Sequence, residues 1–164
     1  MGDSSSLQGH CACQNVRYRL SSKPMFVHCC HCRSCQRESG ASYAVNALIE
    51  SDRVELLEGE LEEIPTPTAS GRGQRILRCS SCKVALWSHY AYAGIGERVR
   101  FVRVGTLEEP DGVPPDIHIF TLSKQPWVEL GQGVPAVPEF YKASEYWPQE
   151  SLDRRAALFE KRGD

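Results

Sequence analysis

The sequence predicts a mainly β protein with one helix at its C-terminal end. Short segments in which apolar and polar residues alternate recur along most of the 164-residue chain, and turn residues separate them. Near the end, Leu152, Ala156 and Phe159 repeat at helical spacing over roughly 150–161. Seven of the eight cysteines also fall into three tight groups beside predicted strands. Together these observations favour antiparallel sheets whose turns carry metal ligands.

The predicted elements follow one another closely. We expect a flexible tail at 1–8, a zinc-binding domain at 9–148 and the terminal helix at 149–164, packed on the domain or extending from it. A short helical turn at 36–40 ends at Gly40, and 65–71 has the composition of a loop. In the strand at 98–104 the alternation breaks at Phe101 and Val102, which predicts a bulge. The expected strands are 16–20, 25–27, 43–49, 53–57, 74–78, 84–90, 98–104 and 117–119.

Composition excludes some classes of function. The formal net charge is −2, and two Zn²⁺ ions held by seven thiolates would make it about −5. This balance, without a basic stripe, argues against binding to nucleic acid or to an anionic membrane surface. No apolar run is long enough to span a membrane, and the polar N-terminus does not resemble a secretory signal. We therefore expect a cytoplasmic protein, whose reduced cysteines bind metal rather than form disulfides.

Two cysteine pairs predict a closed, structural zinc site. Cys11 and Cys13 are separated by one residue, and Cys79 and Cys82 by two. Each pair is next to a predicted strand, so two turns brought together would give a tetrahedral four-cysteine site. The alternatives are four unrelated buried cysteines or a disulfide between Cys79 and Cys82.

The third group predicts an open zinc site. Cys30, Cys32 and Cys35 offer three ligands within six residues, which leaves a coordination position for water or substrate. His28 or His31 is an alternative fourth ligand that would close the site. Cys29 is adjacent to Cys30 and is expected to face the core. The sequence thus predicts two zinc ions per chain.

These motifs resemble the glutathione-dependent formaldehyde-activating enzymes and their centromere protein V-like relatives. The resemblance covers roughly 9–141, and its cysteine spacing is specific. It rests on segments in the expected order, Gly9-His-Cys-Ala-Cys13, Val16-Arg-Tyr18, Cys30-His-Cys-Arg-Ser-Cys-Gln-Arg37 with Gly40, Cys79-Ser-Ser-Cys82 with Leu86, His118-Ile-Phe120 and Lys124-Gln-Pro-Trp127.

The resemblance implies a β-tent fold of small antiparallel sheets around a structural zinc. It assigns the four paired cysteines to that ion, and Cys30, Cys32 and Cys35 to a catalytic zinc. The implied reaction joins formaldehyde and glutathione to S-(hydroxymethyl)glutathione, the activity of a carbon–sulfur lyase. The sequence departs from the family pattern at Lys83, where glycine is common, and at Gln14-Asn15. We expect a differently shaped turn at Lys83, and Asn15 to tolerate left-handed geometry.

Several side chains are candidates for catalysis or substrate binding beside the catalytic zinc. Such an ion could bind the thiol of glutathione or polarise the aldehyde, and the electron-rich three-thiolate set favours the thiol. His118 is either a proton shuttle or a structural histidine. A non-catalytic zinc-stabilised scaffold is the alternative function. Candidates for substrate carboxylates and pocket walls are Arg33, Arg37, Arg72, Arg75, Arg78, Trp87, Tyr90, Tyr92 and Trp127.

Overall fold

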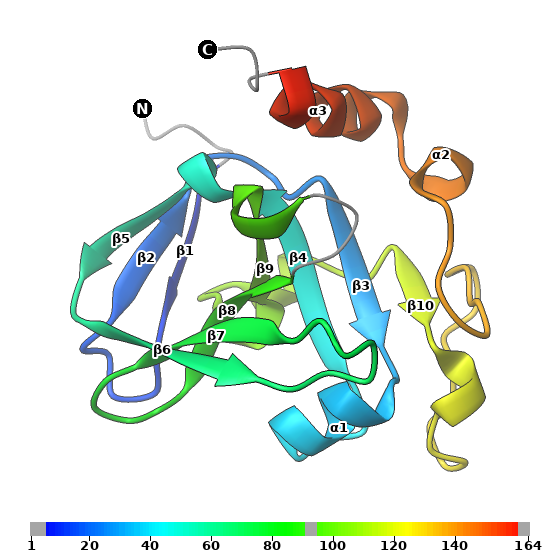
Figure 1. Cartoon of the computed structure of the whole chain (residues 1–164), viewed down its shortest axis with the longest axis horizontal. Coiled ribbons are helices and arrows are strands. Elements are labelled where there is room, and N and C mark those ends of the chain that lie inside the picture. Colours follow the sequence, from blue (N-terminus) through cyan, green and yellow to red (C-terminus); the bar gives the residue numbers. More distant parts are fainter. Residues whose placement is uncertain (1–5, 91–94, 161–164) are drawn as a thin grey trace.

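The computed structural model describes residues 6–90 and 95–160, and ten strands in this part form two sheets (Figure 1). The small sheet has the order β1-β2-β5, with bounds Leu7–His10, Arg17–Leu20 and Val54–Glu58. The large sheet has the order β10-β3-β4-β9-β8-β7-β6. In that order its strands are Ile117–Ile119, Phe26–Cys30, Ala44–Glu50, Val99–Arg103, Ala85–Tyr90, Gln74–Cys79 and Leu61–Thr66. The prediction of a mainly β protein is confirmed.

Helices are few and short apart from the last one. The α-helices of the described residues are α1 Arg33–Ser39, α2 Ala143–Tyr146 and α3 Gln149–Glu160. Single 3-10 turns lie at Ser51–Arg53, Gly96–Arg98, Val104–Thr106, Pro110–Gly112 and Thr121–Ser123. Gly40 ends α1 in a left-handed conformation, as its position predicted. No helix of the described ranges is both long enough and apolar enough to cross a bilayer.

The seven-stranded sheet has a hydrophobic core on each face. Val102 belongs to the core shared with the small sheet, whereas its neighbour Phe101 belongs to the second core. Their pairing with β4 is regular, with Leu48 opposite Phe101 and Ala47 opposite Val102. The predicted bulge was therefore wrong. The alternation breaks because β9 is buried on both faces, so both faces carry apolar residues.

Two strands differ from expectation. Strand β6 extends through Pro65 to Thr66, where a loop was predicted. It is an edge strand, where proline is tolerated because one row of amides faces outward. At the other edge, β10 pairs with β3 in parallel, an exception within a mainly antiparallel sheet.

Helix α3 packs on the second core through Leu158 together with Leu152 and Phe159, two of the three residues of the predicted apolar face. Leu158 and Ser151 are buried, whereas Ala156 is exposed. Ser151 Oγ donates to the Met25 carbonyl at 2.6 Å, and Arg154 forms a salt bridge with Glu50 at 2.5 Å. These polar contacts add to the apolar packing that holds α3 on the core.

Candidate metal centres and substrate pocket

Four cysteines meet between the small sheet and the end of β7. Cys11 and Cys13 lie in the turn that joins β1 to β2, Cys79 is the last residue of β7, and Cys82 follows in the turn to β8. The Cys13 sulfur lies 3.5 Å from that of Cys11 and 3.8 Å from that of Cys79. All four sulfurs lie within 4.8 Å of one another. These separations suit one tetrahedral metal ion bound by four thiolates.

The two turns that carry these pairs have the same backbone design. Cys11 N–H donates to the Val16 carbonyl, and Cys79 N–H donates to the Val84 carbonyl. In each turn the residue after the second cysteine is left-handed, with φ 62° at Gln14 and 65° at Lys83. The expectation of a different turn at Lys83 was wrong, and the left-handed residue of the first turn is Gln14 rather than Asn15. Two non-glycine residues adopt the conformation that glycine supplies at less cost.

The second cysteine group is built where β3 runs into α1. Cys30 ends β3, Cys32 caps α1, and Cys35 lies in the first turn of that helix. Cys35 N–H donates to the Cys32 sulfur at 3.3 Å. The three sulfurs lie within 4.8 Å of one another, and no histidine, carboxylate or further cysteine of residues 6–90 and 95–160 completes the group. The arrangement offers three ligand atoms to a metal ion.

Neither candidate histidine joins this group, because strand alternation places His31 on the other face and His28, on the same face as Cys30, is turned toward Tyr141. Side chains along β3 point alternately to opposite faces, so His31 lies on the side of Cys29 and away from Cys30. The Nε2 atom of His31 lies 3.0 Å from His118 Nδ1 and 3.6 Å from the Cys29 sulfur. His28 is buried and contacts the Tyr141 hydroxyl at 2.5 Å.

The pKa values of the second group show how unequally its three sulfurs hold charge. Hydrogen bonds from Cys30 and then Cys35 lower the pKa of the Cys32 thiol to about 2. The same contacts, with Cys32 foremost, and burial raise the pKa of Cys30 far above its ordinary value. One thiolate is thus stabilised by two thiols. A divalent cation is what allows all three sulfurs to become thiolates together.

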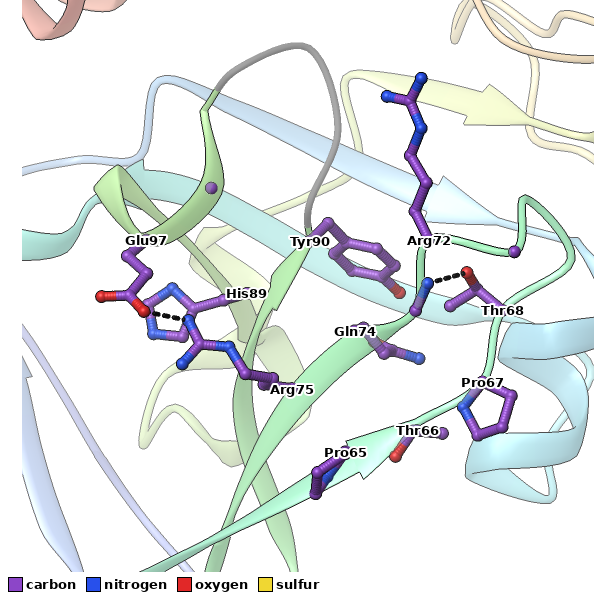
Figure 2. Close-up of a pocket in the computed structure, with 13 residues that line it drawn as sticks. Pro65, Thr66, Pro67, Thr68, Arg72, Gln74, Arg75, His89, Tyr90 and Glu97 are labelled. Atoms are coloured by element: carbon purple, nitrogen blue, oxygen red, sulfur yellow. Dashed lines mark hydrogen bonds and ion pairs between the residues drawn. The ribbon is translucent and has the colours of Figure 1, made fainter.

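A pocket of about 770 Å³ lies between the β6–β7 hairpin and the end of β8 (Figure 2). Arg72, Arg75 and Glu97 bring charge to it, and Gln74 and Tyr90 lie along its wall. Arg75 is already paired with Glu97 at 2.7 Å. The Oε1 atom of Gln74 is buried and has no hydrogen-bond partner. A guanidinium and an unsatisfied amide therefore line the same cavity.

Tyr90 connects this pocket with the three-cysteine group. Its side chain packs against the core that contains Cys30 and Cys35, and it also lines the pocket. Burial, and next the nearby charge of Cys35, raise the pKa of Tyr90 well above its ordinary value. The hydroxyl therefore stays protonated and can donate a hydrogen bond.

Among the described residues, the other side chains that the sequence suggested for substrate binding lie outside this pocket. Arg78 pairs with Glu38 at 2.7 Å, and Arg33 donates to the side chain of Gln36 at 2.6 Å. Trp87 is a core residue, whereas Trp127 is 71 % exposed.

Arg37 lies in the last turn of α1 and is not among the residues that line the pocket described above. Tyr92 lies outside the described residues.

The sequence did not identify Gln74 as a pocket residue, because nothing marks it beyond its place at the start of a strand. It also missed that Cys29, His31 and His118 meet, which needed the parallel pairing of β3 and β10.

Comparison with known proteins identifies the family of this chain. A crystal structure of a Rhodobacter sphaeroides protein is similar with 18 % identity and a TM-score of 0.45, covering 66 % of this chain and 91 % of that one. No curated protein matches the sequence. The sequence profile described as glutathione-dependent formaldehyde-activating enzyme matches residues 6–123, which include all seven clustered cysteines. The chain belongs to the glutathione-dependent formaldehyde-activating enzyme family.

Proposed function

We propose that the protein catalyses the addition of glutathione to formaldehyde, giving S-(hydroxymethyl)glutathione, and that it does so in the cytoplasm. The observation that carries this proposal is an incomplete three-cysteine group beside a charged pocket. Family membership supports the choice of substrates. The reaction forms one carbon–sulfur bond, removes the thiol proton and adds a proton to the former carbonyl oxygen. It is the reverse of a carbon–sulfur lyase reaction.

We assign Cys11, Cys13, Cys79 and Cys82 to a structural zinc and Cys30, Cys32 and Cys35 to a catalytic zinc. The four-cysteine set joins two turns distant in sequence, whereas the three-cysteine set has no fourth ligand among the described residues. When bound, the second ion supplies a coordination position for a thiol sulfur and lowers the pKa of that thiol.

The pocket offers charges that complement glutathione. Glutathione carries two carboxylates and one ammonium group, and the pocket combines Arg72 and Arg75 with Glu97. Arg72 is the guanidinium that we assign to a substrate carboxylate, because Arg75 is held by Glu97 and Glu63. The Gln74 amide supplies a buried acceptor for an N–H of the peptide.

Tyr90 is the group that we assign to the aldehyde oxygen. Charge builds on that oxygen as the carbon–sulfur bond forms, and a donor aimed at it stabilises the transition state. Tyr90 lines the pocket, and the charges of Cys30, Cys32 and Cys35 act on its hydroxyl, so this donor is near both the pocket and the cysteine group.

Exchange spectroscopy with ¹³C-labelled formaldehyde and glutathione tests this function. Thiols add to formaldehyde without help, so the rate is measured with and without the protein. We expect an interconversion rate that rises in proportion to protein concentration above the buffer rate. A rate equal to that of buffer at all protein concentrations would leave a zinc-stabilised scaffold as the function.

A further inference from the structure

A third cluster of metal-ligating side chains lies on the other face of β3 from Cys30. In the parallel pairing of β3 with β10, Cys29 is directly opposite His118. Opposed residues in such a pair project to the same face, and His31 follows Cys29 by two residues. His31 stays in line with the sheet because its N–H donates to the Ile119 carbonyl at 3.0 Å. The topology thus brings one thiol and two imidazoles to one point.

The polar contacts of this cluster converge on a single atom. His31 Nε2 lies 3.0 Å from His118 Nδ1 and 3.6 Å from the Cys29 sulfur. The other ring nitrogen of His31 is buried without a partner. A neutral imidazole nitrogen has either one proton or one lone pair, so Nε2 cannot make two good hydrogen bonds at once.

The separations match those around a tetrahedral metal ion. With metal–sulfur and metal–nitrogen bonds of about 2.3 and 2.05 Å, the ligand atoms are separated by about 3.5 Å for a nitrogen and a sulfur and about 3.3 Å for two nitrogens. The observed 3.6 Å and 3.0 Å are close to these values. The three ligand atoms all lie within 4.8 Å of one another.

We propose that Cys29, His31 and His118 form a third metal site, which takes a divalent transition-metal ion of the zinc type. One thiolate and two imidazoles suit such an ion, whereas Mg²⁺ and Ca²⁺ require oxygen ligands. Cys29 and His31 are buried, and His118 is half-buried. This site is separate from the proposed catalytic set because it lies on the opposite face of β3.

The site would fasten a short strand to the sheet. Strand β10 has three residues at the edge of the large sheet, where it pairs with β3 on one side and is joined on the other by the bridge of His118 with Ala136. An ion bound to Cys29 and His31 on one side and His118 on the other would tie β10 to the segment that carries Cys30 and Cys32. Its role is therefore structural support for the three-cysteine group.

Metal content of the full chain tests this proposal independently of any enzymatic activity. Zn²⁺ is titrated into protein that already holds two ions, against a chromophoric chelator, and bound zinc is counted by native mass spectrometry. We expect the wild type to bind one further equivalent, and Cys29→Ser and His118→Gln to bind none. Both variants should keep the first two ions and the wild-type circular dichroism spectrum, which shows that they fold.

Nitrogen chemical shifts of the histidine rings give a second readout. On binding the third equivalent, we expect the ¹⁵N shifts of His31 Nε2 and His118 Nδ1 to change, with His10 as the unaffected control. The proposal is overturned if the wild type binds only two ions under these conditions. It is also overturned if Cys29→Ser and His118→Gln each bind a third ion as the wild type does.

Discussion

The Glu38 carboxylate accepts a hydrogen bond from Arg78 Nη2 at 2.7 Å and thereby links the two cysteine groups. Glu38 lies on α1, which carries Cys35, and Arg78 immediately precedes Cys79. Arg103 binds the second oxygen of the same carboxylate at 3.2 Å. The Glu38 side chain is only 7 % exposed, so the bridge is poorly screened by solvent.

Glu38→Gln should therefore destabilise the fold by about 1–3 kcal/mol, because it leaves two guanidinium groups without a charged partner. Chemical denaturation measures this change. We also expect faster loss of zinc from the three-cysteine group in the presence of a chelator, since α1 is less firmly held. Glu55→Gln is the control, because Glu55 forms an exposed pair with Arg19 and should change stability by less than about 1 kcal/mol. Equal stability of the two variants would contradict this role of Glu38.

Glycine at position 14 should stabilise the protein. Gln14 has φ 62° in the turn that carries Cys11 and Cys13. Glycine removes a left-handed strain of about 1–2 kcal/mol but adds entropy to the unfolded chain. The expected net gain for Gln14→Gly is about 0.5–1 kcal/mol, seen as a higher melting temperature. Asn15→Gly is the control, because the backbone at Asn15 is not left-handed, and it should lower the melting temperature. A higher melting temperature for both variants would argue against the strain explanation.

The sequence could predict these turns as metal-binding but could not show their strain. The spacing of metal ligands is a local feature of the sequence. The division of the seven cysteines into two pairs and a group of three could therefore be predicted from their positions alone. The identity of the left-handed residue depends on how each turn closes, as with Val16 and Val84. The meeting of Cys29 with His118 depends on a parallel pairing between two segments that are distant in the sequence. The sequence of either segment alone does not show which strand it pairs with or in which register.

Arg72→Ala should raise the KM for glutathione roughly tenfold with a smaller change in kcat. Loss of one charge-assisted hydrogen bond to a carboxylate costs about 1.5 kcal/mol, which is a factor of about ten. Steady-state rates, corrected for the uncatalysed addition, measure the effect. Arg19→Ala removes an arginine from the small sheet, away from the pocket, and should leave KM unchanged. An unchanged KM in Arg72→Ala would remove Arg72 from the binding site.

Tyr90→Phe should lower kcat roughly tenfold and leave zinc content unchanged. The substitution removes one hydrogen-bond donor near the cysteine group and keeps the ring that packs on Phe101. Turnover and metal content are measured on the same sample. A wild-type kcat in this variant would contradict the role that we assign to the hydroxyl.

The anchoring of α3 should weaken in acid. Burial by itself raises the pKa of Glu50, but the hydrogen bond and charge of Arg154 bring it below its ordinary value. A carboxyl group whose folded pKa is lowered contributes stability above its unfolded pKa of about 4.3, and this stability is lost as pH falls through the folded value. We expect Arg154→Gln to be less stable than the wild type at pH 7, by about 1–3 kcal/mol.

That difference should shrink as pH falls through the unfolded pKa of about 4.3 toward the lowered folded pKa of Glu50, below which Glu50 is protonated in both proteins. Denaturation of the two proteins at matched pH measures it, because other acid-sensitive groups affect both equally. A difference that stays constant from pH 7 to pH 3 would show that Arg154 acts through packing rather than through charge.

The central claim is that Cys30, Cys32 and Cys35 hold a catalytic zinc, separate from the structural site. The most direct measurement is zinc per chain, folding and glutathione–formaldehyde turnover in Cys32→Ala beside the wild type. We predict that Cys32→Ala has one zinc ion fewer, a wild-type circular dichroism spectrum and an interconversion rate equal to that of buffer. A folded Cys32→Ala protein that has lost this ion and still turns over at the wild-type rate would contradict the claim.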